Sequence, residues 1–143
     1  MFRILNDRIS VSPQITAGDV ATAAAQGVGL IINNRPEDES EDQTPGDAIA
    51  AAARAAGLDY VAIPVTHAGF SEGQVKAMAA ALAGADKPVL AYCRSGTRST
   101  LLWALAEASR GKNPQALSAA ASAAGYDLSP IKAMIDMLAA NAD

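Results

Sequence analysis

Short apolar runs alternate along this chain with longer segments that carry helix start and stop signals. A run of about four to eight apolar residues suits a buried strand, whereas a longer segment with periodic polar positions suits a helix. Strands are predicted at 8–12, 28–32, 58–65 and 88–91, and helices after them at 16–26, 44–56, 71–83 and 97–110. Such alternation is typical of parallel strands joined by crossover helices. We therefore expect an α/β fold with a mainly parallel sheet of four to five strands and helices on both faces.

Local signals at the helix ends support these boundaries. Thr16 with Asp19, and Ser71 with Gln74, have the spacing of a capping box. Glycine follows four of the predicted helices and ends each of them. A cap residue followed by proline begins three helices, at Thr44-Pro45, Asn113-Pro114 and Ser129-Pro130. The last two of these are predicted to close the fold.

Length and composition restrict the class of protein. The 143 residues predict a single domain spanning 1–143, and the formal net charge of −4 argues against a nucleic-acid partner, which needs a basic stripe. The sequence has no apolar run long enough to cross a membrane and no signal-peptide pattern at its start, so we expect a cytoplasmic protein that is not membrane-bound. One cysteine and one histidine exclude an intramolecular disulfide and a Cys/His zinc site. No metal or cofactor is predicted.

The segment from Glu37 to Asp42 holds five carboxylates in six positions. It has no apolar anchor, so it is predicted to be a solvated, mobile loop. Binding of a divalent metal is the alternative interpretation, but the spacing of a calcium loop is missing.

Polar residues follow three of the predicted strands where each strand ends. Asn33, Asn34 and Arg35 follow the second strand, His67 follows the third, and Cys93 follows the fourth. Because parallel strands bring their carboxyl ends to one edge, where α/β proteins bind ligands, these groups are predicted to form the site.

The loop from Cys93 to Ser99 joins the fourth strand to a helix and has the sequence Cys-Arg-Ser-Gly-Thr-Arg-Ser. A lone buried cysteine is usually a small apolar residue. Here, however, two arginines, Arg94 and Arg98, and a helix N-terminus surround the sulfur, and such surroundings keep a thiol ionised and nucleophilic. We expect Cys93 and Arg98 to be catalytic. The anion would be bound by the loop and by two residues from the neighbouring strand ends: Arg94, Ser95, Gly96, Thr97, Ser99, Arg35 and His67.

The cysteine loop resembles the active-site loop of rhodanese-type sulfurtransferases, in which four residues separate cysteine from arginine. The segments at 9–12, 33–37, 63–65 and 91–93 resemble the dual-specificity phosphatase architecture. Together these motifs resemble the DUF442 family, the beta-lactamase-hydrolase-like phosphatases, over about residues 1 to 110. The resemblance implies a cysteine-phosphatase-like fold, and fusion to persulfide dioxygenases in that family implies such an enzyme as a partner.

The chain departs from cysteine phosphatases, and two of the departures, a shorter loop and a missing aspartate, favour sulfur chemistry. Those enzymes carry His-Cys, five residues, then Arg, whereas this chain has Tyr92 before the cysteine and Ser99 where that arginine is expected. The loop is one residue shorter, which suits a single sulfur atom better than a phosphoryl group. The segment 64–72 also has no aspartate to act as general acid, although His67 or Glu72 could substitute.

We therefore expect a sulfurtransferase that passes sulfane sulfur through a Cys93 persulfide. Its donor would be a small anion such as thiosulfate, a polysulfide or glutathione persulfide. Arg94 and Arg98 would hold this donor, and backbone N–H groups of the loop would stabilise the persulfide. The alternative is a cysteine phosphatase that hydrolyses aryl or protein phosphate esters through a Cys93 phosphocysteine. A third possibility is a non-catalytic module that binds an anion or a partner protein.

Overall fold

A five-stranded sheet forms the centre of the protein in the computed structural model, which describes residues 2–142. The strands are β1 (Arg3–Ile4), β2 (Ile9–Ser12), β3 (Leu30–Asn33), β4 (Asp59–Ala62) and β5 (Val89–Tyr92), arranged in the order β1-β2-β5-β3-β4. Among these strands, only the β1–β2 pair is antiparallel. The predicted α/β class and mainly parallel sheet are confirmed, and β5, the strand that precedes the cysteine, is central.

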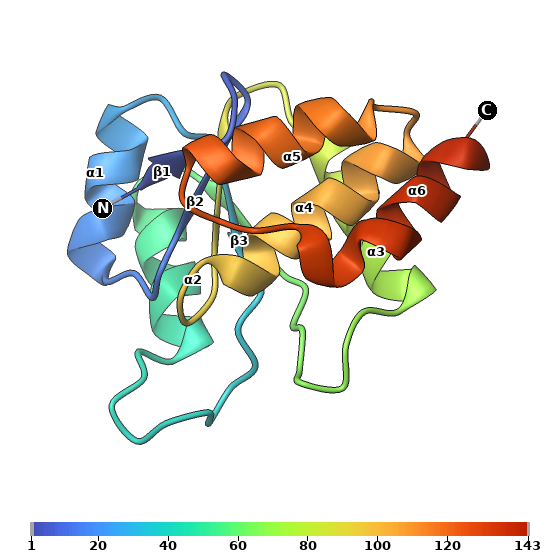
Figure 1. Cartoon of the computed structure of the whole chain (residues 1–143). Helices are drawn as coiled ribbons and strands as arrows, with labels where there is room; N and C mark the ends of the chain where they lie inside the picture. The colour runs from blue at the N-terminus through green and yellow to red at the C-terminus, as the bar shows by residue number, and fades with distance from the viewer. Residues whose placement is uncertain (1, 143) are drawn as a thin grey trace.

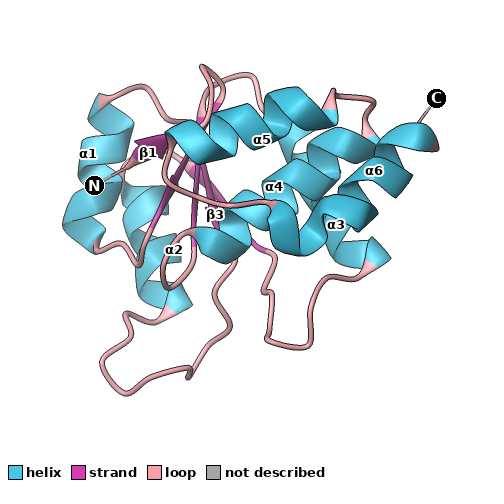
Figure 2. Ribbon diagram, in the orientation of Figure 1, coloured by secondary structure: helices cyan, strands magenta, loops and turns pink. Residues whose placement is uncertain are grey.

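Helices cover both faces of this sheet, as Figures 1 and 2 show. Helices α1 (Ala17–Ala25) and α2 (Gly46–Ala55) lie on one face, and on the other lie α3 (Glu72–Gly84), α4 (Thr97–Ser109), α5 (Pro114–Ala123) and α6 (Lys132–Ala140). Residues of β5 alternate between the two cores. Leu90 and Tyr92 pack with α1 and α2, whereas Val89 and Ala91 pack toward α4, which is buried along most of its length. Burial on both faces explains the continuous apolar run of this strand.

The predicted elements need four corrections. β1 was not expected, because two exposed residues carry no periodic signal. β4 ends at Ala62 rather than at residue 65, although Ile63 and Val65 still donate backbone hydrogen bonds to Asn33, the last residue of β3, and to Asn34. Ser129-Pro130 begins a 3₁₀ turn, Ser129–Ile131, before α6.

The fourth correction concerns the start of α2. Thr44 was expected to cap this helix, but the cap position is Pro45, which has no side-chain cap bond. Instead Glu37 Oε1 accepts the backbone N–H of Gly46 at 2.9 Å. A carboxylate is favourable here because helix N-termini carry unpaired N–H groups and partial positive charge. One residue of the acidic segment therefore anchors a helix.

The loops that follow β3, β4 and β5 all leave the sheet at the same edge, the lower one in Figure 1. This is the carboxyl edge of the parallel strands, where the sequence predicted the site. Within residues 2–142, no helix is both long and apolar enough to cross a membrane.

Candidate active site

Cys93 is the first residue after β5, and its side chain is completely buried. Its backbone N–H donates to the carbonyl of Ser12, at the end of β2, at 3.3 Å. The backbone N–H of Gly96 donates to Cys93 Sγ at 3.1 Å. The sulfur is therefore held by the sheet on one side and contacted by a loop N–H donor on the other.

The loop turns sharply at Gly96, the N-cap of α4. Its φ of 90° lies in the left-handed region, which favours glycine. The turn leads directly into α4, which begins at Thr97. The N-terminus of this helix therefore comes shortly after Cys93 in the chain. Positive potential at that N-terminus favours an anion, whether a thiolate or a ligand.

Arg98, in the first turn of α4, is fixed by two groups from other loops. Its Nη1 and Nη2 donate to the two carboxylate oxygens of Glu39, each at 2.8 Å, and Nη1 also donates to the carbonyl of Val65 at 2.6 Å. The side chains of Arg98 and Glu39 are both 14% exposed. Three loops, those after β3, β4 and β5, therefore meet at one guanidinium.

Charge pairing governs the ionisation of both partners. Hydrogen bonds from Arg98, with those from Arg35, lower the pKa of Glu39 to about 2 against the opposing effect of its desolvation. The pKa of Arg98 is raised, mainly by Glu39, and the nearby Cys93 sulfur contributes to this shift. Glu39 is therefore a carboxylate at neutral pH, and Arg98 is a cation close to the sulfur.

Arg35 was predicted to bind the anion, but the structure places it behind Glu39. It is 4% exposed, and its side chain donates to Glu39 Oε1 at 3.0 Å, to Gln14 Oε1 at 2.9 Å and to Ser40 Oγ at 3.1 Å. These bonds engage all three guanidinium nitrogens. Arg35 therefore supports the site through Glu39.

The structure also corrects the prediction of a solvated acidic loop. Glu39 is largely buried between two arginines, and Glu37 caps α2. The carboxylates of Asp38, Glu41 and Asp42 remain on the surface. Within residues 2–142, no group of three or more His, Cys, Asp or Glu side chains is placed to hold a metal ion.

The remaining predicted residues are divided between surface and core. Arg94, Ser95 and Thr97 are exposed on the loop, and the Ser95 hydroxyl donates to Thr97 Oγ1 at 3.0 Å. Ser99 is completely buried, and its hydroxyl has no partner among the described residues, so it does not line the exposed part of the loop. His67 is exposed, two residues after the carbonyl that Arg98 contacts.

Glu72 was the other residue considered as a proton donor, but its carboxylate is paired with a lysine on the surface of α3. It is the first residue of α3, is 82% exposed, and pairs with Lys76 at 2.9 Å. This pairing lowers the pKa of Glu72. At neutral pH it is therefore ionised and engaged on the surface.

Two residues at the site were missed by the sequence analysis. Glu39 lies four positions after Arg35 inside a run of carboxylates, so nothing marked it as different from its neighbours. Tyr126 lies far along the chain, yet its hydroxyl donates to the carbonyl of Ser95 at 3.0 Å. No local pattern could have linked it to the cysteine loop.

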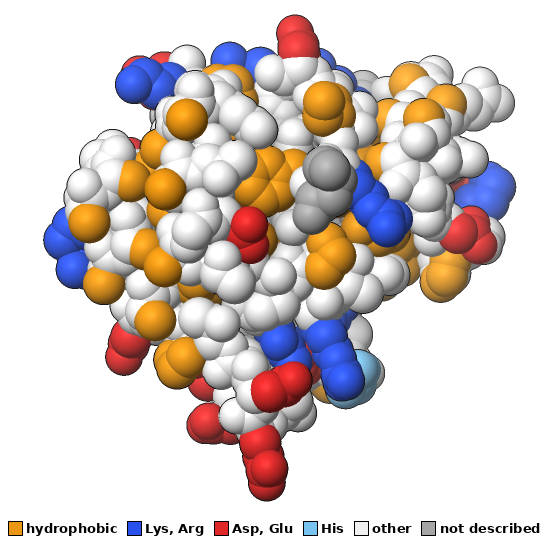
Figure 3. Space-filling view, turned by 90° about the vertical axis from the view of Figure 1, so that its left-hand side faces the viewer, with side chains coloured by type: hydrophobic (Ala, Val, Ile, Leu, Met, Phe, Trp, Pro, Cys, Tyr) orange, Lys and Arg blue, Asp and Glu red, His pale blue; other side chains and the backbone are white. Residues whose placement is uncertain are grey.

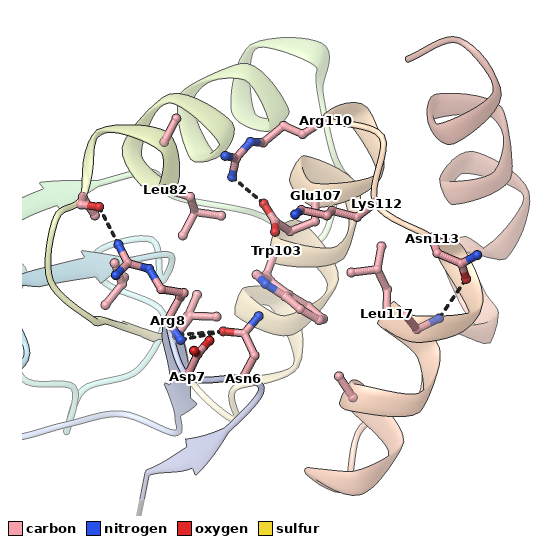
Figure 4. Close-up of a pocket in the computed structure, with 16 residues that line it drawn as sticks. Asn6, Asp7, Arg8, Leu82, Trp103, Glu107, Arg110, Lys112, Asn113 and Leu117 are labelled. Atoms are coloured by element: carbon pink, nitrogen blue, oxygen red, sulfur yellow. Dashed lines mark hydrogen bonds and ion pairs between the residues drawn. The ribbon is translucent and has the colours of Figure 1, made fainter. Parts of the chain in front are cut away.

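A pocket of about 690 Å³ lies at the opposite edge of the sheet (Figure 4). Ile9 and Val89, the first residues of β2 and β5, line it together with Trp103, Glu107 and Arg110. Three of its charged groups are engaged locally, since Arg110 pairs with Glu107 at 2.7 Å and Arg8 donates to the carbonyl of Ala85 at 2.6 Å. None of the predicted site residues lines this pocket, whereas Cys93 and Arg98 lie together at the carboxyl edge, so the cysteine loop is kept as the candidate site.

The sequence was compared with protein-family models and with the sequences of known proteins. The family model for the phosphatase-like domain of beta-lactamase hydrolase-like proteins matches residues 1–110. The chain belongs to this family. A beta-lactamase hydrolase-like protein of Xylella fastidiosa is 37% identical over 125 residues, which are 87% of this chain but 29% of that protein. The chain therefore spans less than a third of the length of this relative.

Solved structures of phosphatases share the fold of this chain. A candidate phosphatase from Neisseria meningitidis is 33% identical, with a TM-score of 0.82 over 95% of this chain and 96% of its own. TpbA from P. aeruginosa, in complex with pTyr, is 17% identical, with a TM-score of 0.65 over 99% of this chain and 84% of its own. The predicted cysteine-phosphatase-like architecture is therefore confirmed.

These relatives support the phosphatase alternative and give no support to the sulfurtransferase, to its sulfur donors or to a dioxygenase partner. The loop is one residue short, but Arg98 lies within the first turn of α4, where Glu39 and the carbonyl of Val65 fix its side chain. A shorter loop therefore still places an arginine at the start of this helix.

Proposed function

We propose that this chain is a cysteine-dependent phosphatase that acts on phosphate esters. The thiolate of Cys93 attacks the phosphorus atom, the bond to the ester oxygen breaks, and the alcohol or phenol leaves with the bonding electron pair. Water then cleaves the phosphocysteine, which releases inorganic phosphate and restores the thiolate. The observation that carries the proposal is the buried Cys93 sulfur, which accepts the Gly96 N–H, with Arg98 following it in the first turn of α4.

The donors left on Arg98 support binding of a phosphoryl group. A guanidinium carries five N–H donors. Glu39 and Val65 take three of them, both on Nη1 and one on Nη2. The remaining pair, on Nε and Nη2, forms one edge of the guanidinium, and such an edge matches two oxygens of a phosphoryl group. Glu39 would then orient the arginine rather than compete for it.

Neither Glu39 nor Glu72 suits the role of a general acid, because Glu39 is ionised at neutral pH and Glu72 is engaged by Lys76. We propose that His67, which is exposed on the loop after β4, does not take this role either. A leaving oxygen that receives no proton departs readily only when it is a weak base. We therefore propose aryl phosphates, phosphotyrosine among them, as the substrate class. TpbA and PTPMT1, which share the fold, have been crystallised with pTyr and with PI(5)P, respectively.

Steady-state hydrolysis of a series of aryl phosphates, with p-nitrophenyl phosphate as the reference, tests the proposal. Cys93→Ser should abolish turnover. Arg98→Lys, which loses the two-oxygen edge, should lower kcat/KM by about 100-fold or more, as expected when a transition-state donor is lost. Arg110→Lys is the matched control, because Arg110 follows the other end of α4 and pairs with Glu107; its kcat/KM should stay within about twofold.

Incubation with thiosulfate, followed by intact-mass measurement, distinguishes the two chemistries. A gain of one sulfur atom that depends on Cys93, together with no release of phosphate from any aryl ester, would overturn the phosphatase and restore the sulfurtransferase. Phosphate release that survives in Cys93→Ser would show that another group is the nucleophile. Steep dependence of kcat/KM on the acidity of the leaving phenol is the result expected when no general acid takes part.

A further inference from the structure

Tyr126 lies beneath the cysteine loop although it is remote from it in sequence. It follows α5, is 9% exposed, and donates its hydroxyl to the carbonyl of Ser95 at 3.0 Å. A Cβ atom added to Gly96 would overlap this hydroxyl, so the ring and the loop are in close contact. The family model ends at residue 110, and Tyr126 therefore lies in the part of the chain beyond it.

The bond to Tyr126 and the bond to the nucleophile belong to the same peptide unit. The carbonyl of Ser95 accepts from Tyr126, and the N–H of Gly96 donates to Cys93 Sγ at 3.1 Å. A trans peptide is planar, and its carbonyl and N–H point in opposite directions. When the carbonyl is held on the tyrosine side, the N–H must therefore point to the sulfur side.

Rotation of that peptide would reverse both groups. The residue after the peptide bond is glycine, which has few conformational barriers to such a rotation. After rotation the sulfur would lose its N–H donor, and a carbonyl oxygen would face the anion site instead. An ionised sulfur and a bound phosphoryl group would both be destabilised.

We propose that Tyr126 is a positioning residue for the nucleophile, which holds the Ser95–Gly96 peptide with its N–H directed at the Cys93 sulfur. The inference rests on the proposed function, in which that sulfur reacts as a thiolate. It assigns a role in the reaction to the C-terminal segment. It also explains why the loop needs glycine at position 96, since the tyrosine hydroxyl occupies the space that a side chain would fill.

The surroundings of Tyr126 keep its hydroxyl a donor. Burial raises the pKa of Tyr126 against the opposing effect of the nearby Arg3 cation, so the hydroxyl remains protonated at neutral pH. The guanidinium of Arg3 lies over the ring, 5.1 Å from its centroid, and donates to the carbonyl of Ala124 at 3.4 Å. The ring is therefore held in place by β1 as well as by its own segment.

Tyr126→Phe tests the role, because it removes the hydroxyl and keeps the ring. The ultraviolet absorbance of the thiolate is followed against pH, with Cys93→Ser as the blank, and kcat and KM are measured on p-nitrophenyl phosphate. We expect the midpoint of thiolate formation to move up by roughly one pH unit, the effect of losing one hydrogen bond to a charged group. We expect kcat/KM to fall about tenfold at neutral pH and to recover in part at higher pH.

Ser109→Ala is the matched control. Ser109 is part-buried at the end of α4, and its hydroxyl donates to the carbonyl of Ala106 at 2.6 Å. The variant therefore also loses one bond from a hydroxyl to a carbonyl, but at the end of α4 that is opposite to the cysteine loop. Its thiolate midpoint and kcat/KM should match those of the wild type. Thermal unfolding of Tyr126→Phe and Ser109→Ala measures how much each lost hydrogen bond lowers the stability of the protein, apart from any effect on the thiolate.

The outcomes separate the inference from the function on which it rests. An unchanged midpoint in Tyr126→Phe, in a protein whose wild type forms a thiolate and hydrolyses the ester, would overturn the role of Tyr126 and leave the phosphatase intact. Equal shifts in Tyr126→Phe and Ser109→Ala would also overturn it, because the effect would then be general loosening. No thiolate signal near neutral pH in the wild type would contradict the proposed function itself.

Discussion

At the scale of single residues, Glu39 shows how a charged surface segment can contribute to a site. Its two oxygens accept three hydrogen bonds from Arg35 and Arg98, and both arginines are largely buried. A buried cation without a partner is costly, whereas a carboxylate with this many donors is stable in its ionised form. Glu39 therefore stabilises the arrangement that holds Arg98 beside the sulfur.

Replacement of Glu39 by glutamine should destabilise the protein in a pH-dependent manner. The pKa of Glu39 is lowered from 4.5 to about 2, so its ionisation favours the folded state above pH 4.5, and this contribution is lost as the pH falls through about 2. We expect Glu39→Gln to lower the free energy of unfolding by about 1–3 kcal/mol at pH 7. Urea unfolding at a series of pH values measures the difference, which should narrow between pH 4.5 and 2.

Glu72→Gln provides the control for this measurement. Glu72 also pairs with a cation, Lys76, but both side chains are more than 70% exposed. Such pairs contribute little because solvent screens them. An effect of Glu72→Gln equal to that of Glu39→Gln would contradict the role given to the buried pair, as would a Glu39 effect that does not change with pH.

At the scale of elements, the start of α4 depends on one glycine for two separate reasons. Gly96 has a φ of 90°, and a Cβ there would overlap Tyr126. Gly57 has a φ of 80° but no atom close to the position of its Cβ. The two glycines therefore separate the cost of the backbone conformation from the cost of the contact.

Gly57→Ala should lower the free energy of unfolding by about 1–2 kcal/mol, the cost of a left-handed conformation for a residue with a side chain. Gly96→Ala should cost more and should also lower kcat, because the loop must shift away from Tyr126. The double variant Gly96→Ala with Tyr126→Phe should be less destabilised than the sum of the single variants, since the overlapping hydroxyl is gone. Additive effects in urea unfolding would exclude overlap with the Tyr126 hydroxyl as the main cause.

The elements that the sequence predicted well are those with a strong local signal. The capping boxes at Thr16 and Ser71 form as expected, and β5 follows from a continuous apolar run. The start of α2 was assigned to Thr44 because local spacing favoured it, but the group that accepts its first N–H is Glu37, nine residues before Gly46. β1 has no pattern of its own and exists only because β2 offers an edge.

The same distinction holds for the site. Cys93, Gly96 and Arg98 could be found because they lie together in one loop between a strand and a helix. Glu39 and Tyr126 could not, because each is brought to the loop by the folding of a distant segment. Arg35 was found as a candidate, but the sequence did not reveal that Gln14, Glu39 and Ser40 would engage its donors.

At the scale of the whole molecule, a cationic site lies within an acidic protein. The net charge is −4, and the exposed carboxylates of Asp38, Glu41 and Asp42 belong to the loop that carries Glu39. Acidic side chains gather beside Lys and Arg side chains at the lower end of the molecule in Figure 3. The site therefore attracts a small anion over a short range, while its rim repels a larger acidic ligand.

This charge distribution predicts a preference among phosphotyrosine peptides of equal length. A peptide with lysines beside the phosphotyrosine should have a kcat/KM about 3–10-fold higher than one with glutamates, when both are measured at an ionic strength of about 0.02 M. At about 0.5 M salt the two values should converge, because the added ions screen the charges of the peptide and of the rim from each other. Asp38→Asn combined with Glu41→Gln should reduce the preference at low salt, whereas Asp136→Asn, on α6, should leave it unchanged. A preference for the acidic peptide, or one that salt does not alter, would show that the rim carboxylates do not select the substrate.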